Sequence, residues 1–211
     1  FDDEAARAGC FFGRRVTYVA AVDSTNRMAT QLAERDAPAG TVVLADAQVA
    51  GRGRLARSWF SPPGRNAYLS LILRPPIPPV RVPQLSLVAA VACARAIEAV
   101  CGVAPRVKWP NDLYIDGRKV SGILCDMRAE TDRLAFLILG IGININIAPH
   151  EFPEEIAEFA TSLSAACGKR VNRVRLICKL LDALELAYNE WMENGLAGFR
   201  DAWRERSLLH G

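Results

Sequence analysis

Hydrophobic residues recur along the chain with either the two-residue period of a strand or the 3.6-residue period of a helix. The segments with strand-like patterns are concentrated in the first two thirds of the chain. Runs rich in apolar and β-branched residues predict strands, which we place at Thr17–Val22, Thr41–Ala45, Ala67–Leu73, Leu113–Ile115, Val120–Met127 and Leu134–Ile147. Asp116-Gly117 joins two of these runs, and Asp-Gly between apolar runs is a strong signal of a β-hairpin.

Apolar residues at helical spacing predict helices over Asn26–Arg35, Leu85–Val100, Val174–Trp191 and Phe199–Arg204. The side-chain oxygens of Asp23, Ser24 and Thr25 are placed to cap the start of the first helix. Because hairpins exclude a sheet in which all strands are parallel, the pattern predicts an α+β domain with one mixed β-sheet flanked by helices.

Composition narrows the class of protein. The 211 residues are 51% hydrophobic and carry a net charge of +3, which suits one globular domain. The longest uncharged stretches, Val82–Ala94 and Leu134–Pro149, are shorter than the roughly 20 residues of a membrane span, so we expect no contact with a membrane.

Six cysteines without a CxxC pair predict free thiols in a reducing, cytoplasmic environment. The two histidines lie far from metal-ligand spacing, which argues against zinc sites and His-based triads.

The segment Gly51–Trp59 reads GRGRLARSW and follows a predicted strand at short distance. Glycines let a backbone approach a ligand closely, and arginines donate planar hydrogen bonds to carboxylate or phosphate. The segment therefore predicts an anion-binding loop. A basic surface loop, including one that contacts nucleic acid, is the alternative, although few aromatic residues alternate with the arginines.

The segment Lys108–Asp112 reads KWPND. Pro110 restricts Trp109 to an extended conformation, and the resulting corner holds a lysine and an aspartate, a combination suited to a metal–nucleotide complex. An ordinary turn with a core tryptophan is the alternative interpretation.

Two further positions combine small residues with polar ones. Lys119 precedes Ser121-Gly122, so its ammonium either enters a pocket floored by Gly122 or is solvated on a strand. In Gly140–Asn144 the glycines either kink a strand or let a flat ring lie on the backbone. The segment is not a dinucleotide-binding fingerprint, because the third glycine and the following helix are missing.

Taken together in chain order, these motifs resemble the catalytic domain of biotin protein ligases. They are DSTN at 23–26, Gln48 followed by AGRGR at 50–54, Trp59, KWPND at 108–112, KVSGIL at 119–124 and GIGIN at 140–144. The resemblance implies a mixed-sheet fold related to class II aminoacyl-tRNA synthetases and lipoate ligases. It also implies a catalytic domain over residues 1–206, the start of a C-terminal SH3-like domain at 207–211, and no N-terminal helix-turn-helix domain.

The resemblance implies an activity in two steps. Biotin and ATP form biotinyl-5′-AMP and pyrophosphate, and the biotinyl group then passes to a lysine of a carboxylase's biotin carboxyl carrier domain. ATP and Mg²⁺ would be needed, with Asp112 as the metal ligand. The implied catalytic residues are Lys119, Arg52 and Lys108. The implied biotin-binding residues are Ser24, Thr25, Asn26, Gln48, Gly51, Arg52, Lys119, Gly122, Gly140 and Ile141, and the nucleotide-binding residues are Arg54, Arg57, Trp59, Asn111, Asp112 and Asn144.

Two other functions fit parts of the pattern. A lipoate–protein ligase is the nearest enzymatic alternative, and a non-enzymatic regulator that binds biotin adenylate is the other. We expect no nucleic-acid partner, because the basic residues form no stripe along the sequence. The family resemblance also implies a homodimer.

Ala56 stands where the family pattern GRGRxGRxW has glycine, so a left-handed backbone there would cost the loop about 1 kcal/mol.

Overall fold

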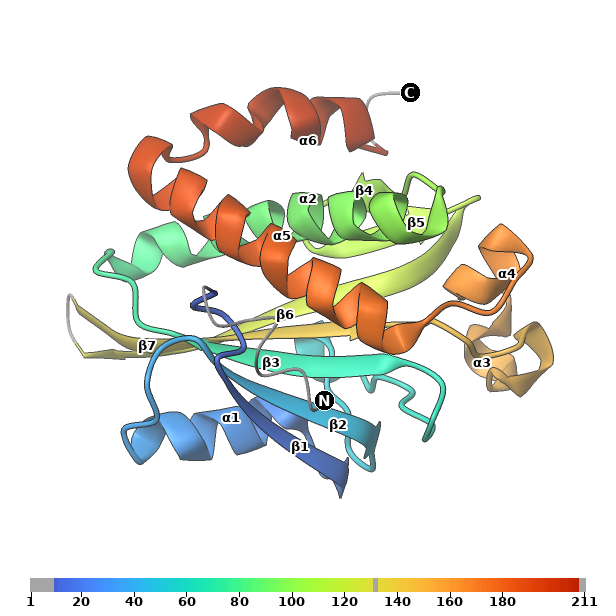
Figure 1. The fold of residues 1–211 in the computed structure, drawn as a ribbon, viewed down its shortest axis with the longest axis horizontal. Coiled ribbons are helices and arrows are strands. Elements are labelled where there is room, and N and C mark those ends of the chain that lie inside the picture. The colour runs from blue at the N-terminus through green and yellow to red at the C-terminus, as the bar shows by residue number, and fades with distance from the viewer. Residues whose placement is uncertain (1–9, 131–132, 209–211) are drawn as a thin grey trace. The chain divides into compact units, whose positions relative to one another are not determined.

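The structure is a computed structural model that describes residues 10–130 and 133–208 (Figure 1). Its strands are β1 (Arg15–Val22), β2 (Thr41–Gln48), β3 (Ala67–Leu73), β4 (Arg106–Lys108), β5 (Asp112–Ile115), β6 (Arg118–Glu130) and β7 (Arg133–Ile143). Its α-helices are α1 (Thr25–Glu34), α2 (Val82–Cys101), α3 (Glu154–Ala157), α4 (Leu163–Cys167), α5 (Arg173–Asn194) and α6 (Arg200–Arg206). Short 3-10 helices are η2 (Arg54–Ala56), η3 (Pro79–Arg81), η4 (Pro149–Glu151) and η5 (Ala197–Phe199).

The strands form one mixed sheet of seven in the order β1-β2-β3-β7-β6-β5-β4. β1 runs parallel to β2, whereas β2 with β3, β4 with β5 and β5 with β6 are antiparallel. The predicted α+β class with a mixed sheet is therefore confirmed. The chain divides into two compact units, unit 1 (Phe1–Leu85 with Leu124–Gly142) and unit 2 (Ser86–Ile123 with Ile143–Gly211).

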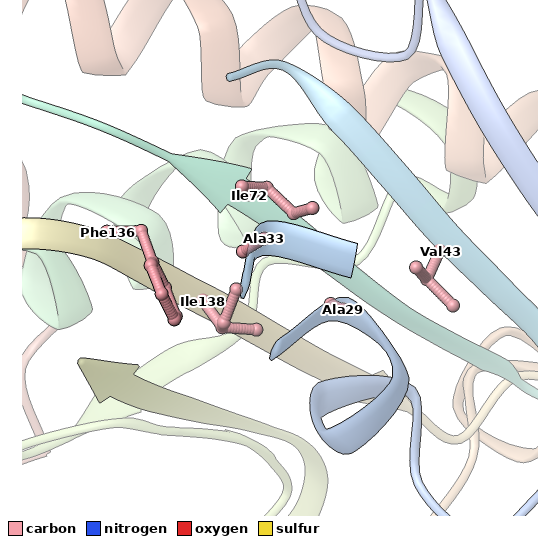
Figure 2. Packing of buried hydrophobic residues seen from close by; sticks show 6 residues of the cluster. All are labelled: Ala29, Ala33, Val43, Ile72, Phe136 and Ile138. Carbon is pink, nitrogen blue, oxygen red and sulfur yellow. The ribbon is translucent and has the colours of Figure 1, made fainter. Parts of the chain in front are cut away.

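In unit 1, α1 connects the parallel strands β1 and β2 and packs on the sheet through its small residues. Ala29 and Ala33 are buried against side chains from three strands, namely Val43, Ile72, Phe136 and Ile138 (Figure 2). Alanines at this spacing share one face of the helix, and their small size lets the helix lie close to the strands. This packing fixes the first turn of α1, which holds Thr25 and Asn26.

In unit 2, β5 and the start of β6 form the predicted hairpin. Asp116 and Gly117, between the strands, have φ angles of 48° and 75°. Positive φ at both central residues is typical of a type I′ turn, whose twist matches that of antiparallel strands. β4 extends this hairpin by one strand, and with three residues it is too short to produce a periodic pattern.

Helix α5 has the amphipathic pattern that its sequence predicts. Its buried positions recur at helical spacing: Leu176, Ile177, Leu180, Leu181, Leu184, Ala187 and Trp191. Asn172 caps its first turn by accepting a hydrogen bond from Arg175 N at 3.0 Å. The helix begins one residue earlier and ends three residues later than predicted.

The segment Pro79–Cys101, which contains α2, is long and apolar enough to cross a membrane by length and composition, with a mean hydropathy of 1.6. Our count of uncharged residues missed this, because Arg95 interrupts the apolar stretch. In the fold, 61% of its most apolar window is buried. A mostly buried apolar helix of this kind is typical of the core of a folded domain.

All six cysteines lie in the described part of the chain and are free thiols, as predicted. Burial raises the pKa of Cys93 far above its ordinary value. Burial, together with the neighbouring thiol of Cys167, raises the pKa of Cys101 to about 11. Both thiols are therefore protonated at neutral pH and serve as small hydrophobic side chains.

Ile72→Ala tests the packing of α1 on the sheet. We expect the free energy of unfolding to fall by about 2–5 kcal/mol, since Ile72 is fully buried and its truncation leaves a cavity in the core. Leu186→Ala, on an exposed position of α5, is the control and should change stability by less than about 0.5 kcal/mol. Urea denaturation measures both, and equal effects would contradict the packing described.

Candidate functional site

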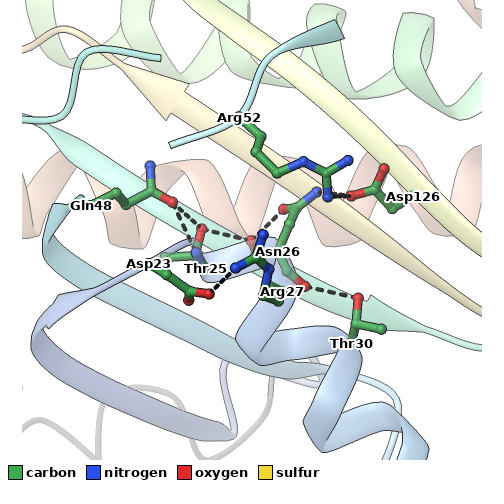
Figure 3. A network of polar contacts seen from close by, with 9 residues as sticks. Asp23, Thr25, Asn26, Arg27, Thr30, Gln48, Arg52 and Asp126 are labelled. Carbon is green, nitrogen blue, oxygen red and sulfur yellow. Dashed lines mark hydrogen bonds and ion pairs between the residues drawn. The ribbon is translucent and has the colours of Figure 1, made fainter. Parts of the chain in front are cut away.

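The first turn of α1 is held by side chains from distant parts of unit 1. Ser24, Thr25 and Asn26 are buried although they are polar. Gln48 Oε1, at the end of β2, accepts hydrogen bonds from Thr25 N at 2.9 Å and from Thr25 Oγ1 at 3.1 Å (Figure 3). Gln48 Nε2 in turn donates to Ser61 Oγ at 3.0 Å. The Gln48 side chain therefore satisfies the first backbone N–H of α1. Of the predicted capping residues Asp23, Ser24 and Thr25, Ser24 makes no side-chain capping bond, so the prediction is wrong for it.

Asp23 fixes the turn that leads into this helix. Ser24 N donates to its Oδ1 at 2.6 Å, and this hydrogen bond is the main reason why the pKa of Asp23 is lowered. Arg27 Nη1 donates to the other carboxylate oxygen at 2.6 Å and lowers the pKa further. Both oxygens are thus used to shape the backbone next to the buried residues.

Asn26 connects α1 to two strands. Its Nδ2 donates to Asp126 Oδ2 on β6 at 2.9 Å, and Ser70 Oγ on β3 lies 2.6 Å from its Oδ1. Arg52 Nη1 lies 3.6 Å from the same Asp126 oxygen (Figure 3). Sequence reasoning missed Asp126 and Ser70. The signal for Asp126 was a single carboxylate within the apolar run of a predicted strand, a position that charged residues seldom occupy without a partner.

The loop Gly51–Trp59 closes on itself as a narrow hairpin. Trp59 N donates to Gly51 O at 2.9 Å, Arg52 and Ser58 form a β-bridge, and Gly53 N donates to Arg57 O at 2.7 Å. A Cβ atom at Gly51 would lie 2.5 Å from Trp59 O, so only glycine fits. Arg54 and Arg57 are exposed near the tip, where both side chains can reach a ligand in solvent.

Leu55, in this loop, has a left-handed backbone conformation. Its φ is 55° and its ψ is 40°, and its side chain is 84% exposed. A left-handed backbone is strained at a residue other than glycine, and this side chain makes little contact to offset the strain. The cost that the family pattern implies at Ala56 stays a prediction.

Gly140 and Gly142 on β7 make room for two side chains of the site. A Cβ atom at Gly140 would overlap Asn26 Oδ1, and one at Gly142 would lie 2.6 Å from the Trp59 indole. The ring that lies on the backbone at Gly142 is the protein's own Trp59, whereas the neighbour of Gly140 is the Asn26 amide. Ile141 lies between the glycines, so its side chain points to the opposite face of the strand, where it is buried.

In unit 2, the charged residues of the KWPND and KVSGIL motifs share one face of β4, β5 and β6. Lys108 lies opposite Asp112, and Asp112 lies opposite Gly122. Lys119 Nζ and Asp112 Oδ2 form an ion pair at 2.7 Å, in which both side chains are mostly buried. Lys119 is therefore not a solvated strand lysine, and a glycine beside the pair leaves space on the sheet.

An irregularity in strand pairing makes this ion pair geometrically feasible. Leu113 pairs with Ser121 but Tyr114 pairs with Lys119, so Val120 is an extra residue on β6. Side chains alternate between faces along a strand, and an extra residue shifts that alternation by one. The shift puts Lys119 on the face of Asp112 and leaves Ser121 on the buried face.

The exposure of Trp109 decides against one interpretation of the KWPND corner. The Trp109–Pro110 peptide bond is cis, and the Trp109 side chain is 60% exposed, so the alternative of an ordinary turn with a core tryptophan is wrong. Lys108 is also exposed, and its ammonium lies 5.0 Å from the centre of the Tyr114 ring. The corner thus presents a cation and an indole to solvent beside the ion pair.

Asn111 and Asn144 stabilise the backbone around this pair. Asn111 Nδ2 donates to Ile123 O at 2.6 Å, and Ile123 N donates to Asn111 O at 2.9 Å. Asn144 Nδ2 donates to Thr161 O at 3.1 Å, while Asn144 N donates to Val120 O at 2.9 Å. Both side-chain nitrogens are therefore used inside the fold.

Asp112 has one carboxylate oxygen available for a cation. Within the described residues, its Oδ1 is buried and has no hydrogen-bond partner, while Oδ2 is paired with Lys119. A buried carboxylate oxygen without a partner is costly and suits a hard cation such as Mg²⁺. No group of three or more His, Cys, Asp or Glu residues gathers around a metal position in the described chain. A metal ion here would take one protein ligand and the rest from phosphate and water.

The predicted site residues fall into two sets. Unit 1 holds Ser24, Thr25, Asn26, Gln48, Gly51, Arg52, Arg54, Arg57, Trp59, Gly140 and Ile141, and unit 2 holds Lys108, Asn111, Asp112, Lys119, Gly122 and Asn144. Convergence of the two sets on one ligand stays a prediction.

Comparisons with known proteins identify the family of these motifs. The model of the biotin/lipoate A/B protein ligase family matches residues 18–144. The chain is 36% identical over 200 residues to the biotin–acetyl-CoA-carboxylase ligase of Paracoccus denitrificans, covering 92% of this chain and 81% of that protein. It is 44% identical over 196 residues to the bifunctional ligase/repressor BirA of Bacillus subtilis, covering 93% of this chain but only 60% of that relative's length.

Comparison with solved structures identifies the same family. The biotin protein ligase from Aquifex aeolicus in complex with biotin and ATP has a TM-score of 0.80 and 33% sequence identity, covering 92% of this chain and 79% of that chain. The fold described above is therefore that of biotin protein ligases.

Gly140→Ala tests the contact between β7 and Asn26. We expect the variant to lose about 1–3 kcal/mol of stability, because the added methyl group overlaps the Asn26 amide. Asn26→Ala should recover part of this loss in the double variant, since it removes the overlapping group. Gly53→Ala, whose added atom meets ordinary contacts, is the control. Thermal unfolding of the four variants tests this, and additive losses would contradict the contact.

Leu55→Gly tests the strain in the loop. Glycine adopts a left-handed backbone without penalty, so the variant should hold the loop in the described conformation more stably by about 1 kcal/mol. Limited proteolysis after Arg54 and Arg57 measures the difference. Faster cleavage of Leu55→Gly than of the unmodified protein would show that the strain lies elsewhere.

Proposed function

Because the chain belongs to the biotin/lipoate A/B protein ligase family, we propose that it is an ATP-dependent biotin protein ligase. It activates biotin as biotinyl-5′-AMP and transfers the biotinyl group to a lysine of a biotin carboxyl carrier domain. The structural observation that best supports this proposal is the Lys119–Asp112 ion pair, in which a cation for a reacting anion stands beside a carboxylate oxygen available for a metal ion. The relatives named above are biotin ligases, which favours biotin over lipoate as the substrate.

The polar residues of unit 1 are suited to bind the biotin ring system. Ser24, Thr25 and Asn26 are buried, Gln48 is half-buried, and Thr25, Asn26 and Gln48 are oriented by hydrogen bonds within unit 1. A site built in advance loses little entropy when a ligand binds. The glycines at 51 and 140 make room for Trp59 and Asn26, and so help to build the site. The assignment of Gly51, Gly122 and Gly140 to the biotin site rests on the family resemblance.

The first reaction joins two anions. The carboxylate of biotin forms a bond to the α-phosphorus of ATP, and the bond from that phosphorus to the oxygen of the β-phosphate breaks to release pyrophosphate. We assign Arg52, Lys119 and Lys108 to reduce the repulsion between the two anions. No protein nucleophile takes part, and positioning of the reactants can contribute on the order of 7–11 kcal/mol.

We assign the nucleotide to Trp59, Asn111, Asp112, Asn144 and the exposed arginines Arg54 and Arg57. Asp112 Oδ1 would hold Mg²⁺, which supplies positive charge to the phosphates when it is bound. Lys119 orients Asp112 through its contact with Oδ2. One oxygen of this carboxylate would then hold the metal ion, while the other holds the Lys119 ammonium.

In the second reaction, the amine of the carrier lysine attacks the acyl carbon of biotinyl-5′-AMP. An amide bond forms, the bond from the acyl carbon to the phosphate oxygen breaks, AMP leaves, and the amine loses a proton. The loop at 51–58 is suited to cover the adenylate and exclude water. We further propose a cytoplasmic enzyme that pairs with a second copy of itself, as the family resemblance implies.

Pyrophosphate release with Mg-ATP tests the proposed function. We expect release with biotin and little with lipoate, followed by a mass increase of one biotinyl group on an isolated carrier domain. Enzyme-coupled detection of pyrophosphate and mass spectrometry of the carrier measure the two steps. Release with lipoate alone would contradict the assignment of the substrate, and biotin binding without release would favour a regulator.

Lys119→Ala tests the role of its ammonium. We expect the biotin dissociation constant to change by less than about threefold, while the rate of pyrophosphate release falls by at least about 100-fold, because the cation acts mainly on the charge that develops during reaction. Lys179→Ala, on an exposed face of α5, is the control and should keep full activity. Equal losses in binding and rate would show that Lys119 only holds the ligand.

A further inference from the structure

We propose that Asp126 is a positioning residue that holds the guanidinium of Arg52 in the free protein and gives it up to the carboxylate of the incoming ligand. The inference rests on the proposed function, because it takes Arg52 as a group that binds the carboxylate of biotin. It adds a residue that none of the six sequence motifs contains.

The contact between Arg52 and Asp126 has the properties of an exchangeable ion pair. Arg52 Nη1 and Asp126 Oδ2 lie 3.6 Å apart, beyond the usual length of a hydrogen bond. The side chains are 49% and 31% exposed, respectively. Ion pairs with this exposure contribute little to stability, so a ligand carboxylate that accepts two hydrogen bonds from the guanidinium can replace Asp126.

The two partners differ in how firmly they are held. Asp126 Oδ2 also accepts a hydrogen bond from Asn26 Nδ2 at 2.9 Å, and Asn26 is itself fixed by Ser70 and by its close approach to Gly140. Arg52 extends from a loop and has a long, partly solvated side chain (Figure 3). When a ligand binds, the arginine is therefore the partner that moves, and Asp126 remains with Asn26.

The charge of Asp126 sets how strongly the site attracts anions. A carboxylate beside Arg52 offsets its positive charge and competes with any anion that approaches. A ligand must then combine an anionic group with other contacts in unit 1 to replace Asp126. The arrangement selects against small anions that bring charge alone.

Asp126→Asn separates charge from shape. The asparagine oxygen can still accept the hydrogen bond from Asn26, but the side chain no longer competes for Arg52. We expect the variant to bind biotin about two- to fivefold more tightly, the range expected for loss of a partly exposed ion pair. Its affinity for biotin methyl ester, which has no negative charge, should be unchanged. Isothermal titration calorimetry with the full chain measures both ligands.

Two variants serve as controls. Asp126→Glu keeps the charge and should bind biotin within about twofold of the unmodified protein. Asp201→Asn removes one charge from an aspartate that is 88% exposed on α6, and should leave both affinities unchanged. Thermal unfolding of each variant shows whether the fold is retained.

The outcomes distinguish this inference from the proposed function. Tighter binding of biotin alone in Asp126→Asn supports the exchange of Arg52. Equal shifts for biotin and its methyl ester, or weaker binding of biotin, would overturn it and leave Asp126 with a structural role in holding Asn26. If the unmodified protein bound neither ligand, the proposed function would fail, and this inference with it.

Discussion

The proposed reaction depends on the 2.7 Å ion pair between Lys119 and Asp112, because the pair holds a cation next to a carboxylate in unit 2. The pair exists only because Val120 is an extra residue on β6, which turns Lys119 to the face of Asp112. A regular hairpin would place the ammonium among the buried residues around Ser121, where an unpaired charge would be very unfavourable. A local departure from strand pairing thus creates a charged site on an otherwise ordinary sheet.

Unit 1 contains a second cation–carboxylate contact with different properties. The Lys119–Asp112 pair is short and mostly buried, whereas the Arg52–Asp126 pair is 3.6 Å long and partly exposed. Asp112 keeps one oxygen without a partner in the described structure, while Asp126 uses its oxygen for Asn26. These differences suit different tasks. The first pair can keep its cation in place while it accepts a metal ion, and the second can release its cation to a ligand.

Much of the fold could be predicted because its signals are local. β3 matches its predicted bounds at both ends, and Asp116-Gly117 marks the hairpin because only a few residues accept positive φ twice in succession. Site partners such as Ser70 and Asp126 could not be predicted in this way. They lie 44 and 100 residues from Asn26, and no periodicity connects positions that meet only in the folded chain. The left-handed backbone of Leu55 could not be predicted either, because no glycine marks that position.

The proposed function requires that Arg52 and Lys119 act on the same reacting groups. A crystal structure of the protein with a non-hydrolysable analogue of biotinyl-5′-AMP tests it most directly. We predict that the Arg52 guanidinium and the Lys119 ammonium both lie within about 3.2 Å of oxygens in the linkage between the biotinyl and phosphate groups. An analogue that contacts only one of them, while the other remains with its carboxylate alone, would contradict the account.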